Sequence, residues 1–162
     1  MPPHAVKTVK DLIFYQYAKI IASSAKIPGH GFIMSTMKKL SSGEMKMSTV
    51  LRELKIQMTC NENCCEYCNS TEGLSWDHLV PRVKNGPDTA ENHVLACRHC
   101  NSSKGCKGIY EWYGIERKDK LPRLIAGKYL KLLYEIHEKN GTLHEADLNG
   151  DGVLDVFDLE TF

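Results

Sequence analysis

The sequence predicts a small α+β protein that is mostly helical, with a short cysteine-rich module near its centre. Apolar residues recur at helical spacing over residues 5–25, 48–56 and 122–138. Between residues 60 and 104 this periodicity is lost, and cysteine, histidine and asparagine residues gather. Two short apolar runs in that stretch are separated by an Asn-Gly-Pro-Asp turn signal, so we expect them to form two strands.

The elements and regions follow from this pattern. Before the cysteine-rich stretch we expect a helix at residues 5–25, a Gly/Pro/Ser-rich loop at 28–43 and a helix from about Ser48 to Ile56. Within it we expect a strand at 74–83 that Pro81 interrupts, a strand at 93–96 and a helix that begins near Asn101. A long helix at 122–138 follows. We expect four regions, which are a basic helical region at 1–59, the cysteine-rich module at 60–115, a helix packed on it at 116–140 and an acidic tail at 141–162.

The net charge of +1 conceals a strong asymmetry along the chain. Residues 1–60 carry nine Lys and Arg against three Asp and Glu, and residues 104–131 carry eight against three. Residues 132–162 instead carry one basic residue against eight acidic ones. A basic body with an acidic tail favours a polyanionic partner, whereas charges spread over a solvated surface would need none.

Composition excludes a membrane protein. The chain has 162 residues, 42% of them hydrophobic and 25% charged, which suits one ordinary domain. No run approaches the ~18 apolar residues that a membrane span requires. Charged and polar residues flank the apolar patch at Leu12–Tyr15, so we expect an amphipathic helix there and not a cleaved signal peptide. We therefore expect a cytoplasmic protein.

The cysteines have the spacing of a zinc site. Cys65 and Cys68 form one Cys-x-x-Cys pair, and Cys97 and Cys100 form another. Each tight turn aims two thiolates at one point, and four thiolates satisfy tetrahedral Zn²⁺. The total of seven cysteines argues against a closed disulfide set, and zinc–thiolate chemistry suits a reducing compartment. Cys64 remains an alternative ligand to its neighbour.

Acidic and amide side chains next to these cysteines suggest a second metal. A hairpin that returns onto a helix would bring Asp77 and Asn101 together as oxygen ligands of one hard divalent cation, Mg²⁺ or Mn²⁺. His78 would stand beside that cation as a general base, because a neutral imidazole accepts a proton from water near neutral pH. Asn92 is well placed in the sequence to tie the connecting loop by hydrogen bonds.

The stretch from Cys65 to Gly105 resembles the HNH endonuclease family, whose fold is the ββα-metal motif. The likeness lies in the order of its parts, which read CEYC, then WDHLVP, then a Gly-Pro turn, then ENHVLACRHCNSSKG. It covers a quarter of the chain. The resemblance implies a ββα-metal module crosslinked by zinc and flanked by N- and C-terminal helices.

The resemblance also implies roles for the matching residues. His78 would activate the water that attacks phosphorus, Asn92 would order the loop and the base, and Asn101 would share the metal with Asp77. The metal would contact the scissile phosphate and the leaving 3′ oxygen, and the products would carry 5′-phosphate and 3′-hydroxyl ends. The substrate would be DNA, most simply double-stranded, whose phosphates would be neutralised by Arg82, Lys84, Arg98, Lys104 and Lys107.

Aromatic residues and a further histidine surround the implied site. His93 stands where the family usually has an apolar residue, and we expect it to pack beside the site and not to serve as a third metal ligand. We expect Trp76, Trp112 and Tyr113 to fill the core around the zinc module.

Residues 147–158 fit a calcium loop of the EF-hand type, with Gly152 at the sharp turn. The ligands would be Asp147, Asn149, Asp151, Val153, Asp155 and Asp158. The last of these stands where an EF-hand has Glu, which is similar to dockerin loops, but a dockerin needs two such repeats and one is visible. The alternative is a hydrogen-bonded turn that binds no ion.

Together these patterns favour a metal-dependent HNH DNA endonuclease with structural zinc. One ββα-metal site cuts one strand, so a monomer would nick and a homodimer could cut both strands; the sequence leaves this choice open. Two other functions are compatible with parts of the pattern. One is a zinc-crosslinked nucleic-acid-binding protein without turnover, and the other is a calcium-dependent interaction module.

Overall fold

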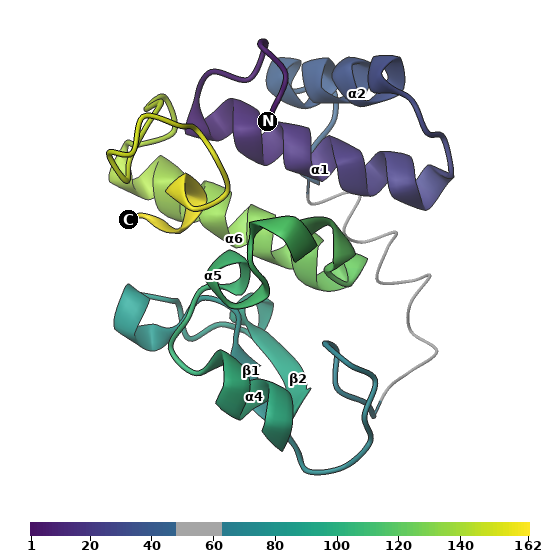
Figure 1. Ribbon diagram of the computed structural model, residues 1–162, viewed down its shortest axis with the longest axis vertical. Helices are drawn as coiled ribbons and strands as arrows, with labels where there is room; N and C mark the ends of the chain where they lie inside the picture. The colour runs from purple at the N-terminus through teal and green to yellow at the C-terminus, as the bar shows by residue number, and fades with distance from the viewer. Residues whose placement is uncertain (48–62) are drawn as a thin grey trace.

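A computed structural model describes residues 1–47 and 63–162, in which a helical layer lies against a small ββα module (Figure 1). The helical layer contains α1 (Val9–Ala25), α2 (His30–Ser42) and α6 (Arg123–Asn140). The ββα module consists of β1 (Leu74–His78), β2 (His93–Cys97) and α4 (Arg98–Lys104). The short elements are α5 (Ile109–Tyr113) and the 3-10 turns η1 (Arg82–Lys84), η2 (Ala90–Asn92), η3 (Ile115–Lys120) and η4 (Asp158–Glu160). The predicted fold class, mostly helical α+β with a ββα module, is confirmed.

Helix α1 begins later than the predicted residue 5 because Thr8 caps it. The Thr8 side chain accepts a hydrogen bond from the Asp11 amide at 3.2 Å, and Asp11 adds negative charge to the first turn. The helix buries Leu12, Ile13 and Tyr17 against its neighbours. It ends at Ala25, where the chain turns into the left-handed region.

The predicted loop at residues 28–43 is wrong, because His30–Ser42 forms helix α2. Its apolar residues Ile33, Met37 and Leu40 recur at helical spacing and pack against the core. The glycines that suggested a loop stand at the two ends, with Gly29 at the N-cap and Gly43 in the left-handed conformation that ends the helix. The helix predicted from Ser48 to Ile56, and the leftover Cys60, lie outside the described residues.

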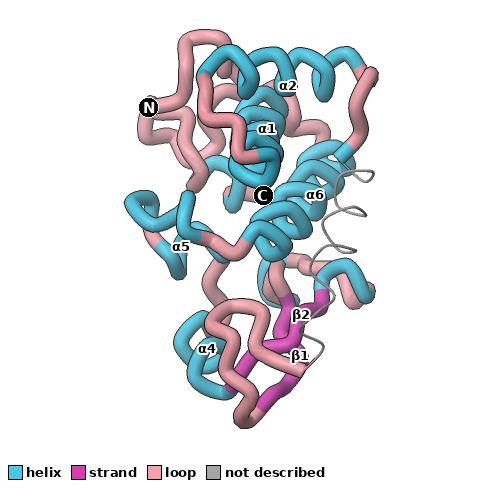
Figure 2. The backbone as a smooth tube through the Cα atoms, turned by 90° about the vertical axis from the view of Figure 1, so that its right-hand side faces the viewer, coloured by secondary structure: helices cyan, strands magenta, loops and turns pink. Residues whose placement is uncertain are grey.

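Helix α6 is the central element of the molecule. It packs on α1 on one side and faces the ββα module on the other (Figures 1 and 2). Its buried face includes Ile125, Tyr129, Leu130 and Leu133, close to the predicted pattern. The Lys128 ammonium donates to the His93 carbonyl at 2.9 Å, so α6 is joined directly to the first residue of β2.

The acidic tail is joined to the ββα side of the molecule through Glu160. Its carboxylate accepts from the backbone amides of Tyr110 and Glu111, at 2.7 and 3.0 Å, and from the Tyr129 hydroxyl at 2.7 Å. These bonds occupy free amides at the start of α5. A Cβ at Gly108 would lie 2.3 Å from a Glu160 oxygen, so only glycine leaves room for this carboxylate.

Across the described residues, none of the helices has the length and apolar character needed to cross a membrane.

A buried histidine holds the tail to α6 and should make stability depend on pH. The His137 ring contacts the Thr142 hydroxyl at 2.7 Å and the Leu159 carbonyl at 3.0 Å. Burial lowers the pKa of His137 below its ordinary value of 6.5, so the fold favours the neutral ring. In the unfolded chain the ring is protonated below about pH 6.5. Its contribution is therefore present above that pH and is lost as the pH falls toward the lower folded-state pKa.

We expect the free energy of unfolding of the wild type to fall more steeply than that of His137→Gln between pH 7 and pH 5. The difference in slope is at most about 1.4 kcal/mol per pH unit, since one proton is involved. Urea denaturation at pH 7, 6 and 5 measures it. Parallel slopes for the two proteins would contradict the assignment.

Candidate functional site

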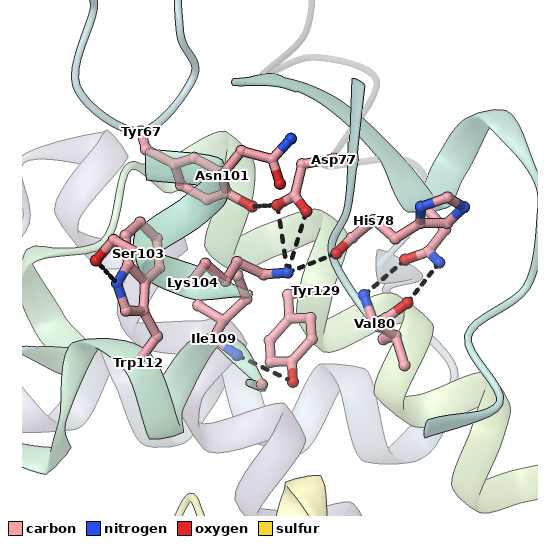
Figure 3. A network of polar contacts seen from close by, with 12 residues as sticks. Tyr67, Asp77, His78, Val80, Asn101, Ser103, Lys104, Ile109, Trp112 and Tyr129 are labelled. Atoms are coloured by element: carbon pink, nitrogen blue, oxygen red, sulfur yellow. Dashed lines mark hydrogen bonds and ion pairs between the residues drawn. The ribbon is translucent and has the colours of Figure 1, made fainter. Parts of the chain in front are cut away.

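The site is built on the antiparallel hairpin of β1 and β2. In its register Asp77 pairs with Val94, and His78 pairs with His93. Successive strand residues point to opposite faces, so Asp77 is buried toward α4 while the His78 ring is partly exposed. In Figure 3 the two side chains leave the strand in different directions. The end of β1 therefore presents a polar side chain on each face of the hairpin.

Four thiols converge at the outer end of the hairpin. The Sγ atoms of Cys65, Cys68, Cys97 and Cys100 all lie within 4.8 Å of one another, with Cys68 and Cys97 at 3.7 Å. Hydrogen bonds from the Asn69 amide to the Cys65 carbonyl (2.8 Å), and from the Cys65 amide to the Ser70 carbonyl (2.7 Å), close the first turn. This set is the one predicted from the two Cys-x-x-Cys pairs, and Cys64 does not belong to it.

The surroundings shift the pKa values of the clustered thiols in opposite directions. The Cys100 amide donates to the Cys97 sulfur at 3.4 Å, which lowers the pKa of Cys97 to about 7. Burial instead raises the pKa of Cys100. Four thiolates at this spacing repel one another unless a cation lies between them, and Zn²⁺ prefers tetrahedral sulfur ligands. The residues present therefore fit a structural zinc ion.

Asp77 lies in a buried polar network between β1 and α4 (Figure 3). Its carboxylate accepts from the Tyr67 hydroxyl at 2.7 Å and pairs with the Lys104 ammonium at 3.2 Å. The same ammonium donates to the His78 carbonyl at 2.7 Å. Burial lowers the pKa of Lys104, and the neighbouring Asp77 charge opposes that shift.

The prediction that Lys104 binds a DNA phosphate is therefore corrected. The side chain of Lys104 is fully buried, and its ammonium is surrounded by protein acceptors. A residue three positions after Asn101 on α4 turns to the same face of the helix, which is the face that packs on the hairpin.

Asn101 lies on the same side of the hairpin as Asp77. Its side-chain nitrogen donates to the Ser75 hydroxyl at 3.1 Å, and Ser75 is two residues before Asp77 on the strand. Figure 3 shows the Asn101 amide next to the Asp77 carboxylate. One carboxylate and one side-chain amide therefore lie on the same side of the hairpin, and the oxygen atoms of both groups are of the type that hard cations prefer.

Asn92 holds the loop between the strands. Its side-chain oxygen accepts from the Val80 amide at 2.8 Å, and its nitrogen donates to the carbonyls of Val80 (2.9 Å) and Pro87 (2.8 Å). Asn92 is fully buried, so it positions the loop and makes no contact with solvent. Gly86 belongs to this loop, and a Cβ at this position would lie 1.8 Å from the Val80 carbonyl oxygen.

The His78 ring meets two groups on the other face of the hairpin. Its Nε2 atom lies 2.9 Å from Nε2 of His93 and 3.2 Å from a carboxylate oxygen of Asp88. The same Asp88 oxygen lies 3.1 Å from Nε2 of His93. The hydrogen bond with His78 is the main cause of a lowered Asp88 pKa. The sequence analysis did not identify Asp88, because the local pattern of a turn does not give the direction of its carboxylate.

Exposed residues around His78 complete this face. Trp76 is on the same strand face as His78 and is 68% exposed, with its ring centroid 6.4 Å from that of His93. The expectation that Trp76 fills the core is wrong, because alternation along β1 turns it outward. Trp112 and Tyr113 do pack in the aromatic group beside Tyr67.

The remaining basic residues predicted to bind DNA lie at the surface. Arg82, Arg98 and Lys107 are exposed. Lys84 is partly exposed and pairs with Glu111 at 3.2 Å. Arg82 begins the 3-10 turn η1, four residues after His78.

The acidic loop is closed by its own side chains. The Asp147 carboxylate accepts from the amides of Gly150 (2.7 Å) and Gly152 (2.9 Å). Asp158 is buried and accepts from the amides of Leu148 (2.7 Å) and Asp155 (2.8 Å). This backbone arrangement accounts for the turn without an ion, so calcium binding stays a prediction.

We expect Cys97→Ser to lose the zinc ion and to destabilise the chain. Each kcal/mol of metal-linked stability that is lost lowers the Tm of a chain of this size by roughly 2–4 °C. Metal analysis and thermal unfolding measure the two effects. The matched control is Cys106→Ser, which changes an exposed free thiol outside the cluster. Full zinc content in Cys97→Ser would contradict the site.

Comparison with known proteins agrees with this geometry. The family model described as HNH endonuclease matches residues 65–107. The CRISPR-associated endonuclease Cas9 of Corynebacterium diphtheriae is 40% identical over 63 residues, which is 36% of this chain and 6% of that protein. No solved structure matches the chain. The hairpin, the helix that follows it and the four clustered thiols of residues 65–107 are therefore a domain of the HNH endonuclease family.

Proposed function

We propose that this protein is a metal-dependent endonuclease that hydrolyses phosphodiester bonds in double-stranded DNA, with His78 as the general base. The observation that supports this most directly is the different exposure of two adjacent side chains at the end of β1. There the His78 side chain is 26% exposed, while Asp77 is buried beside Asn101. A protein that only binds nucleic acid has no need of this combination.

Asp77 and Asn101 are proposed to hold one Mg²⁺ or Mn²⁺ ion. Their donor set fits a hard cation, and a carboxylate has about four lone-pair positions, of which Tyr67 and Lys104 take two. When bound, the ion supplies charge stabilisation at the scissile phosphate and the leaving 3′ oxygen. The Lys104 ammonium already neutralises Asp77, so we expect weak binding of the ion until a DNA phosphate adds its own charge.

His78 is proposed to remove a proton from the attacking water at its Nε2 atom. Two contacts fix the backbone that carries it. The Lys104 ammonium bonds to the His78 carbonyl, and the Asn92 carbonyl accepts from the amide of Leu79, the next residue, at 2.9 Å. Asn92 is therefore a positioning residue and not a catalytic one. The fixed backbone matters because a general base must lie within hydrogen-bond distance of the water from which it removes a proton.

We expect His78→Ala to lower the rate of plasmid cleavage by 10²-fold or more, since general-base catalysis contributes ~10²–10⁴-fold. The assay follows supercoiled plasmid with Mg²⁺ or Mn²⁺, and the form produced distinguishes nicking from cutting of both strands. The control is His99→Ala, which removes an exposed histidine of α4. Zinc content and DNA binding should be equal in all three proteins.

Two outcomes would contradict the proposal. Cleavage by His78→Ala at the wild-type rate would remove the base assignment. Absence of cleavage by the wild type with either ion, together with a salt-sensitive gel shift, would favour a zinc-crosslinked binding protein without turnover.

The exposed face around His78 is proposed to contact DNA. Arg82 would neutralise a phosphate, and Trp76 would lie against a sugar or base. We expect Arg82→Ala to reduce the slope of log K against log[salt] by about 0.9. We expect Trp76→Ala to weaken binding about 5- to 100-fold at each salt concentration with little change of slope. Lys38→Ala, an exposed change on α2, is the control.

We also propose that the loop at residues 147–158 binds Ca²⁺. The backbone of the loop is already folded around Asp147, which lowers the entropic cost of binding an ion. Addition of millimolar Ca²⁺ should then raise the Tm of the wild type, as binding to the folded state requires. Asp151→Ala should abolish the increase. An unchanged Tm in the wild type would favour the ion-free turn and would exclude a calcium-dependent interaction module.

A further inference from the structure

We propose that His78, Asp88 and His93 form a separate binding site for a d-block divalent cation such as Zn²⁺, and that an ion bound there inhibits cleavage. The inhibition rests on the proposed role of His78 as the base, whereas the binding does not. This site is distinct from the four thiols and from Asp77 with Asn101. Among residues 1–47 and 63–162, the thiols and this triad are the two groups of His, Cys, Asp and Glu whose ligand atoms converge within 4.8 Å.

The distances within the triad match a small metal ion. The three ligand atoms are separated by 2.9, 3.1 and 3.2 Å. Ligands at about 2.0–2.1 Å from a tetrahedral zinc ion lie roughly 3.3–3.4 Å apart. The ligand atoms therefore need to move outward by only a few tenths of an ångström to receive the ion.

Hydrogen bonds alone do not account for this triangle. Each Nε2 atom has a single direction in the ring plane, in which it holds either one proton or one lone pair. Nε2 of His78 nevertheless faces two partners, and so does Nε2 of His93. One proton on each ring cannot align with both partners. A cation at the centre of the triangle would receive both ring lone pairs and the carboxylate charge together.

The backbone fixes all three ligands before any ion binds. His78 and His93 are directly opposite each other in the hairpin register. The Lys128 ammonium holds the His93 carbonyl, and Lys104 holds that of His78. Asp88 follows Pro87, whose carbonyl accepts from buried Asn92. This preorganisation reduces the entropy lost on binding.

Ligand type and exposure decide which ion the triad takes. Two imidazoles and one carboxylate suit Zn²⁺ and leave a fourth position for water or an anion. Mg²⁺ prefers oxygen ligands, so it should not compete here. The side chains of His78 and His93 are 26% and 27% exposed and that of Asp88 is 67% exposed, which gives an ion a path from solvent.

A metal ion at the triad would occupy the ring nitrogen of His78 that the proposed catalysis requires. The ion would bind Nε2 of His78, and a metal-bound lone pair cannot accept a proton from water. The same hairpin would then hold zinc in its thiol cluster as a structural element and zinc at the triad as an inhibitor. The two sites should differ in affinity, because four thiolates bind zinc more strongly than two imidazoles and a carboxylate.

The test is a zinc titration of the full chain that already holds one zinc per molecule. Isothermal titration calorimetry with Zn²⁺ should show a second site in the wild type. His93→Gln and Asp88→Asn should each weaken that site at least tenfold. The matched control, His99→Gln, removes an exposed histidine outside the triad and should leave the affinity unchanged. A wild type that binds no second zinc, or variants that bind it as tightly as the wild type, would overturn the inference.

Cleavage then tests the inhibition. With saturating Mg²⁺, the zinc concentration that halves the rate should be at least tenfold higher for His93→Gln than for the wild type, each relative to its own zinc-free rate. If the second zinc binds and the wild-type rate does not change, the inhibitory half is overturned and the base assignment of His78 is contradicted with it. The calorimetry measures zinc binding at the triad whether or not the protein is a nuclease. Failure of the proposed nuclease function and failure of the proposed zinc site are therefore distinguishable.

Discussion

The architecture of the site depends on one buried ion pair, between the Lys104 ammonium and the Asp77 carboxylate. It joins α4 to β1 and also fixes the carbonyl of His78, so a single side chain sets the positions of both faces of the strand end. Removing one partner of such a pair typically costs about 3–5 kcal/mol, because an uncompensated charge stays buried. The pair also moderates the charge of Asp77. If Asp77 holds a cation as proposed, a free carboxylate at this depth would bind it tightly without substrate, whereas the neutralised one would bind it weakly until DNA adds the charge of a phosphate.

The sequence was most informative where spacing alone dictates geometry. Two Cys-x-x-Cys pairs identified the four thiols that converge. It was less informative where burial depends on packing between elements. Lys104 looked like a phosphate ligand because lysine is usually exposed, and only its contact with β1 shows otherwise. Trp76 looked like a core residue because tryptophan is usually well buried. Asp88 lies in a turn that aims its carboxylate at two histidines, and no local pattern encodes that direction.

The HNH domain combines groups of different chemical hardness within a short segment. The four thiols at the outer end of the hairpin suit zinc, the side-chain oxygen atoms of Asp77 and Asn101 would suit a hard cation, and the mixed nitrogen and oxygen triad lies between these extremes. The separation is produced by the fold, since neighbouring residues on β1 contribute to different groups. Availability of each metal, and not only its affinity, would then determine which state of the protein is populated.

The carboxylate of Glu160 joins segments that are about fifty residues apart in the chain. Contacts of such long sequence separation slow folding, because a large loop must close before they form. Such contacts also make local unfolding of the two segments that they join cooperative. The amides of Tyr110 and Glu111 are protected only while the tail is docked, so their hydrogen exchange reports undocking of the tail and not fraying of α5. We therefore expect the tail and α5 to open as one unit of local unfolding, although the charge pattern of the sequence divides them.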